Sequence, residues 1–98
     1  MTRNEFALKV KDKIDLMVMS KDVDYEYESI PMGNNKFFVI YCSRITNGRE
    51  EDIGEVTDFE FYVEEDDETI EAITATSTEW DKCKDDVDYV LLCTTNWK

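Results

Sequence analysis

Carboxylates occupy every second position in two apolar stretches of this sequence. The first stretch is "VDYEYES", residues 23–29, and the second is "DFEFYVEEDDE", residues 58–68. Alternate side chains of a β-strand point to the same face and repeat at about 6.5–7 Å, so each stretch predicts a row of carboxylates on one face of a sheet. Such a row can attract cations, or it can occupy a positively charged groove that otherwise receives nucleic-acid phosphates.

The negative charge is concentrated in one third of the chain. The 98 residues carry a formal net charge of −13, and residues 50–81 contain fourteen Asp and Glu but no Lys or Arg. Like charges on neighbouring strands repel, and a solvated sheet face usually intersperses cations among them. We therefore expect a basic protein as partner, with no direct binding to nucleic acid or membranes. The predicted partner-binding residues are Asp24, Glu26, Glu28, Asp58, Glu60, Tyr62, Glu64, Glu65, Asp66, Asp67 and Glu68.

Metal binding and catalysis have less support. Residues 64–68 offer the oxygen ligands that calcium prefers, but they lack the glycine and ligand spacing of an EF-hand loop. The chain contains no His, the commonest general base near neutral pH, and its three Gly form no phosphate-binding loop. Cys42 and Cys93 lie in apolar runs, which indicates core positions. We expect no enzyme activity, no cofactor and no metal site.

A helix is predicted at the start of the chain, where it can cover a sheet. Apolar residues recur at helical spacing from Arg3 to about Met19, with lysines on the other side. The predicted apolar side consists of Phe6, Val10, Ile14, Met17 and Val18.

Three strands are predicted to follow this helix. Residues 23–30 form the first and end in a hairpin loop, "PMGNN"; residues 36–45 form a central strand with both faces covered; residues 55–65 form the third. The residues expected to face the helix are Val23, Tyr25, Tyr27, Phe59, Phe61 and Val63. Those expected on the opposite face are Asp24, Glu26, Glu28, Asp58, Glu60, Tyr62 and Glu64.

The last third of the sequence is more ambiguous, because residues 70–80 fit both a strand and a helical stripe. We predict a strand to about Thr76, then a short helix opened by Thr76 with Glu79 in a capping box, and a closing strand over residues 87–95. The predicted fold class is α+β. A single domain over residues 1–98 packs its N-terminal amphipathic helix on a mostly antiparallel sheet of four to five strands.

In size, acidity and layout, with "EEDIGEVTDFEFYVEEDDE" at residues 50–68, the chain resembles the small phage-encoded inhibitors of bacterial defence. These are the anti-CRISPR and anti-restriction proteins that mimic DNA. The resemblance implies a host nuclease complex as target, with the acidic side chains competing for its DNA groove. That class shares no motif, so the resemblance assigns no role to an individual residue.

The expected function is stoichiometric inhibition of a basic nucleic-acid-binding protein, by a monomer or a dimer. Two alternatives remain: an immunity protein that neutralises a cationic toxin, and a phage or bacterial structural or assembly protein whose acidity only confers solubility. The three Cys show no disulfide spacing, and the chain has no signal-peptide core and no apolar run of about 20 residues. A cytoplasmic location is expected, in the host cell if the protein is phage-encoded.

Overall fold

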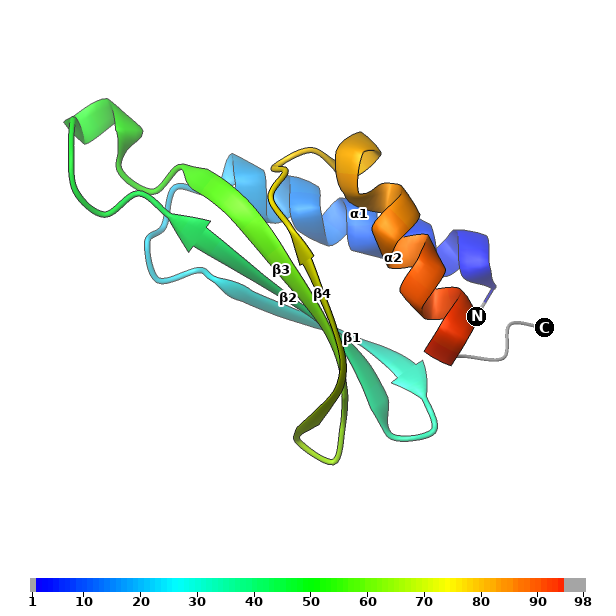
Figure 1. The fold of residues 1–98 in the computed structure, drawn as a ribbon. Coiled ribbons are helices and arrows are strands. Elements are labelled where there is room, and N and C mark those ends of the chain that lie inside the picture. Colours follow the sequence, from blue (N-terminus) through cyan, green and yellow to red (C-terminus); the bar gives the residue numbers. More distant parts are fainter. Residues whose placement is uncertain (1, 95–98) are drawn as a thin grey trace.

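The computed structural model describes residues 2–94 as a four-stranded antiparallel sheet with two helices on one of its faces (Figure 1). The strands lie in the order β1-β2-β3-β4, so each strand pairs with the next one along the chain. This arrangement confirms the predicted α+β class. The elements are α1 (Arg3–Met19), β1 (Tyr27–Gly33), β2 (Lys36–Arg44), the 3₁₀ helix η1 (Glu50–Asp52), β3 (Val56–Glu65), β4 (Glu68–Ala75) and α2 (Trp80–Thr94).

Helix α1 has the predicted bounds and is capped by Thr2, whose hydroxyl accepts a hydrogen bond from the Glu5 amide at 3.2 Å. Its buried side chains are Phe6, Val10, Ile14 and Met17. Val18, which was also predicted on the apolar side, is exposed. A helix turns about 100° per residue, so Val18 lies about 100° round the helix from Met17, at the border of the buried face beyond Ile14.

The β1–β2 and β3–β4 hairpins have two-residue turns of the kind that suits the twist of β-strands. Asn34 and Asn35 connect β1 to β2, so the predicted hairpin is present, but residues 31–33 of the predicted loop "PMGNN" belong to β1. Asp66 and Asp67 connect β3 to β4. All four residues have positive φ, between 53° and 63°, as a type I′ turn requires. Both turns lie at the same end of the sheet, beyond the helices (Figure 1).

The core lies between the helices and the face of the sheet that they cover. Its strand residues are Ile30, Phe38, Ile40, Cys42, Phe59, Phe61, Val63 and Ala75. The predicted helix-facing row Phe59, Phe61 and Val63 is therefore confirmed. β2 is an interior strand, as expected, but the prediction that both of its faces are covered is wrong for Phe37 and Tyr41, which are 42% and 38% exposed.

Residues 80–94 form a helix, so the prediction of a closing strand over residues 87–95 is wrong; Thr95 lies outside the described residues. Cys83, Val87 and Leu91 follow one another at four-residue spacing and are buried, which gives α2 its inner face. The predicted capping box is also wrong. Strand β4 ends at Ala75, the helix begins at Trp80, and the Glu79 amide donates instead to the hydroxyl of Ser77 at 3.0 Å.

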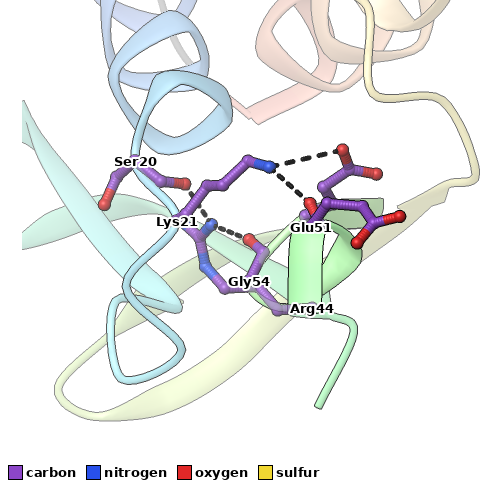
Figure 2. Close-up of polar contacts among 6 residues, drawn as sticks. Ser20, Lys21, Arg44, Glu51 and Gly54 are labelled. Carbon is purple, nitrogen blue, oxygen red and sulfur yellow. Dashed lines mark hydrogen bonds and ion pairs between the residues drawn. The ribbon is translucent and has the colours of Figure 1, made fainter. Parts of the chain in front are cut away.

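Arg44 joins the end of α1 to the sheet and to the loop between β2 and β3 (Figure 2). Its guanidinium donates hydrogen bonds to the carbonyl oxygens of Met17, Ser20, Tyr25 and Gly54, at 2.7, 2.5, 2.6 and 2.6 Å. Its side chain is a buried charge that contacts carbonyls rather than a carboxylate in the described residues. The C-terminal carbonyls of a helix carry partial negative charge, which favours a cation at this position.

The backbone packs very closely where Gly54 meets Lys21. Gly54 has φ of 88°, and a Cβ atom there would lie 1.9 Å from the carbonyl oxygen of Lys21. The Lys21 ammonium donates to the carbonyl of Glu51 at 2.7 Å and pairs with the carboxylate of Glu55 at 3.6 Å (Figure 2). The loop is thus tied to the segment that leads from α1 to β1.

Neither helix in the described part of the chain has the length and apolar character needed to cross a membrane.

Candidate protein-binding face of the sheet

The face of the sheet that the helices leave uncovered is the candidate functional site, and we call it the open face. Residues paired directly across antiparallel strands lie on the same face, so the strand register defines its members. They are Tyr27, Ser29, Pro31, Phe37, Val39, Tyr41, Ser43, Asp58, Glu60, Tyr62, Glu64, Thr69 and Ala72. All of them alternate with the helix-facing residues of the same strands.

Cross-strand pairing arranges the open face in rows that run across the sheet. The first row is Tyr27, Tyr41 and Glu60; the second is Ser29, Val39, Tyr62 and Ala72; the third is Pro31, Phe37, Glu64 and Thr69. Tyr62 is therefore the large residue of a row whose other members are small. A shallow open hollow of about 420 Å³ lies here, lined by Tyr41, Glu60, Tyr62, Glu64 and Thr69.

Three tyrosines form a connected aromatic cluster on the open face. The ring centroids of Tyr27 and Tyr41 are 5.1 Å apart and those of Tyr41 and Tyr62 are 5.7 Å apart, with interplanar angles of 62° and 80°. These are edge-to-face contacts of the kind aromatic rings prefer. Val39 is fully buried although it does not belong to the main core. Since no helix covers this face, the surrounding aromatic side chains shield Val39 from water.

The predicted acidic row on β3 is present. Asp58, Glu60 and Glu64 lie on the open face together with Tyr62, as the alternation indicated. None of the ion pairs among residues 2–94 involves these three carboxylates. The ion pairs found among residues 2–94 involve acids on the helices, on β1 and in the loops, so none of them neutralises the open-face carboxylates.

The carboxylates and the tyrosines of the open face interact. The Tyr62 hydroxyl donates a hydrogen bond to the Glu60 carboxylate at 2.7 Å, and this bond raises the pKa of Tyr62. Burial, followed by the negative charge of Glu64, raises the pKa of Tyr41. Both phenols therefore stay neutral at physiological pH, and their rings lie beside the carboxylates of Glu60 and Glu64.

The prediction for β1 is wrong for Tyr27 and Glu28, which exchange faces. Tyr27 lies on the open face opposite Tyr41, whereas Glu28 pairs with Ile40 on the side of the helices. The Glu28 carboxylate contacts the Lys13 ammonium of α1 at 3.4 Å and accepts a hydrogen bond from the Tyr25 hydroxyl at 2.6 Å. Burial and then this bond raise the pKa of Tyr25 to about 12. Glu28 thus has a structural role at the edge of the core.

A register shift in the first hairpin explains this exchange. The turn sets Gly33 opposite Lys36, but Pro31 lies opposite Phe37, so one extra residue is accommodated between them on β1. A slip of one residue moves every following side chain to the other face. Without that irregularity, Tyr27 would pair with Cys42 and face the helices, as the sequence pattern predicted.

The other predicted site residues lie outside the rows of the open face. Strand β1 begins at Tyr27 rather than at residue 23, so Asp24 and Glu26 belong to the segment that precedes it and are exposed. Residues 65–68 form the β3–β4 turn, directly beyond Glu64. The structure therefore brings together Asp58, Glu60, Tyr62 and Glu64, extends them with the acidic turn, and separates them from the acids before and within β1.

The alternating acids indicated where the face is, but its aromatic half was not recognised from the sequence. The signal was available in β2, where Phe37, Val39, Tyr41 and Ser43 alternate with the core residues. The continuous apolar character of "KFFVIYC" concealed that alternation, because it is typical of a strand buried on both faces.

The described residues form no metal-binding cluster, and their cysteines Cys42 and Cys83 are buried. Residues 2–94 contain no group of three or more His, Cys, Asp or Glu positioned to hold a metal ion. Cys42 and Cys83 are buried free cysteines, and burial raises the pKa of both thiols. Cys42 is thus in the core, as predicted, whereas the side chain of Cys93 lies outside the described part.

Comparison with known proteins gave no match among protein-family models, curated proteins or solved structures.

Proposed function

We propose that this protein is a stoichiometric inhibitor that binds a basic, nucleic-acid-binding protein through the open face of its sheet. The observation that carries the proposal is the row of three carboxylates on β3, Asp58, Glu60 and Glu64, on a face that no helix covers and that contains no Lys or Arg among the described residues. A defence nuclease, such as a CRISPR effector, is the target class that the resemblance implies.

The charge arrangement supports competition with nucleic acid. A groove that binds nucleic acid is lined with Lys and Arg and gains much of its affinity from neutralising phosphates. Asp58 and Glu60 lie about 6.5–7 Å apart along β3, and Glu64 lies about 13 Å beyond Glu60 with Tyr62 between them, so the strand presents three negative charges along one line of the sheet. The acidic turn at residues 65–68 extends the row beyond the sheet, and the net charge of −13 attracts a basic partner from a distance.

The test is capture of a partner from nuclease-treated host lysate at low salt. The wild type is compared with an open-face variant carrying Asp58→Asn, Glu60→Gln and Glu64→Gln. The matched control carries Glu50→Gln, Glu51→Gln and Asp52→Asn in η1, which removes the same number of charges from a site away from the open face.

We expect the wild type and the η1 control to retain one basic nucleic-acid-binding protein and the open-face variant to lose it. Duplex DNA should displace that protein from the wild type. Adding the inhibitor to the purified partner should then abolish nucleic-acid binding at a one-to-one ratio. Equal recovery by all three proteins, or a captured partner that still binds DNA, would show that the open face is not a decoy for nucleic acid.

A further inference from the structure

The open face offers more than negative charge, because its carboxylates lie beside tyrosine rings. Glu60 and Glu64 flank Tyr62 on β3, and Tyr41 lies directly opposite Glu60 on β2. The two rings and the two carboxylates line the same hollow, with Thr69 of β4 at its border. A cation that enters this hollow meets ring and carboxylate groups together.

This combination suits one of the two basic side chains better than the other. The guanidinium of Arg is planar, stacks on aromatic rings and donates two parallel hydrogen bonds to a carboxylate. The ammonium of Lys is instead a compact and strongly hydrated point charge. A cation within about 6 Å of a tyrosine ring centroid is attracted by the ring as well as by neighbouring charges. Phosphate mimicry alone would require the carboxylates and not the rings.

We infer that the hollow between Tyr41 and Tyr62 is an arginine-binding site, which receives an arginine side chain from the partner protein. The inference rests on the proposed function in taking the partner to be a basic protein. One carboxylate, Glu64, accepts the guanidinium, and the rings of Tyr41 and Tyr62 provide its aromatic contact. Glu60 adds negative charge while it holds the Tyr62 hydroxyl in place.

Charge excludes the other occupants of this face. A second copy of the chain would bring Asp58, Glu60 and Glu64 against an equally acidic surface, and like charges placed together cost stability. Nucleic acid and anionic lipid are repelled for the same reason. An arginine side chain is complementary to this face in charge, and its planar guanidinium can stack on the tyrosine rings.

The site is tested with hexa-arginine and hexalysine, two peptides of equal charge, titrated into the full-length protein at one ionic strength. We expect hexa-arginine to bind at least about fivefold more tightly. Its addition should shift the ring NMR signals of Tyr41 and Tyr62, whereas those of Tyr89, which is 69% exposed on α2, should stay in place. The ring shifts are measured on the wild type and need no variant.

Substitutions then distinguish the contribution of the tyrosine rings to peptide binding from that of the carboxylate charge. Tyr41→Leu and Tyr62→Leu retain an apolar cover over Val39 but remove the ring, and they should reduce the arginine preference to less than twofold. Tyr89→Leu is the matched control and should leave the preference unchanged. Glu64→Gln should weaken binding of both peptides more than Glu50→Gln does.

Equal affinity for the two peptides, or hexa-arginine binding that leaves the Tyr41 and Tyr62 signals unmoved, would overturn the arginine site. The proposed function fails separately. If the open-face triple variant loses the captured partner while Tyr41→Leu and Tyr62→Leu retain it at full affinity, the proposed function is supported and the arginine-binding site is contradicted. If the peptides show the arginine preference but no basic partner is captured, the arginine-binding site is supported and the proposed function is contradicted.

Discussion

Arg44 is the residue on which the packing of α1 against the sheet depends most directly. It is 8% exposed, and four carbonyl oxygens from three separate segments converge on it. The Tyr25 ring lies 5.7 Å from its guanidinium carbon, which adds a cation–π contact. A buried charge is tolerated only when its hydrogen bonds are satisfied, and here the backbone itself satisfies them.

Replacing Arg44 should therefore destabilise the protein far more than replacing an exposed arginine. We expect Arg44→Met to lower the free energy of unfolding by about 3–5 kcal/mol, because the buried carbonyls lose their charged donor. Arg44→Lys should recover less than half of this loss, since one ammonium does not reproduce the planar fork. Urea denaturation measures all of these values.

Arg49→Met is the control for this substitution. Its side chain is exposed, at the beginning of η1, and its contact with Glu51 is long, at 3.9 Å. Exposed ion pairs contribute little, so this change should lie within about 0.5 kcal/mol of the wild type. If Arg44→Met lowers the free energy of unfolding by less than 1 kcal/mol, water replaces the guanidinium and the Arg44 hydrogen bonds do not stabilise the packing of α1 on the sheet.

At the scale of the elements, the hairpin turns set the register of the strands and hence which side chains lie on each face of the sheet. The β1–β2 turn uses two asparagines and the β3–β4 turn uses two aspartates, and both residue types tolerate positive φ better than most L-residues. Asp66 and Asp67 also stand between the acids of β3 and those of β4. Glycine would suit the positive φ of this turn better than Asp67 does, so the two aspartates maintain negative charge beside the open face at some cost in stability.

Asp67→Gly should stabilise the β3–β4 hairpin. Its φ of 63° strains an L-residue but not glycine, and one negative charge is removed from an acidic turn. We expect the midpoint of thermal unfolding to rise, with a gain of about 0.5–1 kcal/mol in the free energy of unfolding. Glu68→Gly removes the same charge one residue later, within strand β4, and should lower stability instead. If the two variants behave alike, charge rather than backbone conformation governs this turn.

At the scale of the whole molecule, charge is distributed unevenly between the two layers. Cations of the described helices pair with acids of the helices and of β1, as in the Lys11–Asp15 pair at 2.8 Å, whereas the open face carries acids and no described Lys or Arg. Repulsion among the open-face acids opposes folding, so a surface arranged in this way has a cost in the free protein. A basic partner would remove that cost upon binding.

Salt should therefore stabilise the free protein. Raising the ionic strength from 0.01 to 0.15 M shortens the screening length from about 30 to about 8 Å. We expect the midpoint of thermal unfolding to rise by roughly 2–4 °C, equivalent to about 0.5 kcal/mol. The variant with Asp58→Asn, Glu60→Gln and Glu64→Gln should respond less than the η1 control does. A midpoint that falls with salt would mean that the attractive ion pairs of the helices outweigh repulsion on the open face.

The sequence by itself determined the features that depend on neighbouring residues. Helical spacing predicted α1 with its bounds, the alternation in β3 predicted which of its side chains face the core, and "PMGNN" predicted a hairpin after the first strand. These features are local, because side-chain direction within one helix or strand follows from its own geometry.

Only the tertiary structure decided which side chains share the open face. The extra residue between Pro31 and Gly33 moved Tyr27 onto that face and Glu28 away from it, and no local pattern marks such a shift. Residues 87–94 likewise have strong strand-forming character, yet they lie in a helix that packs Val87 and Leu91 against the core. Register and packing depend on contacts between distant segments, so the tyrosine cluster beside the carboxylates appears only once the strands are paired.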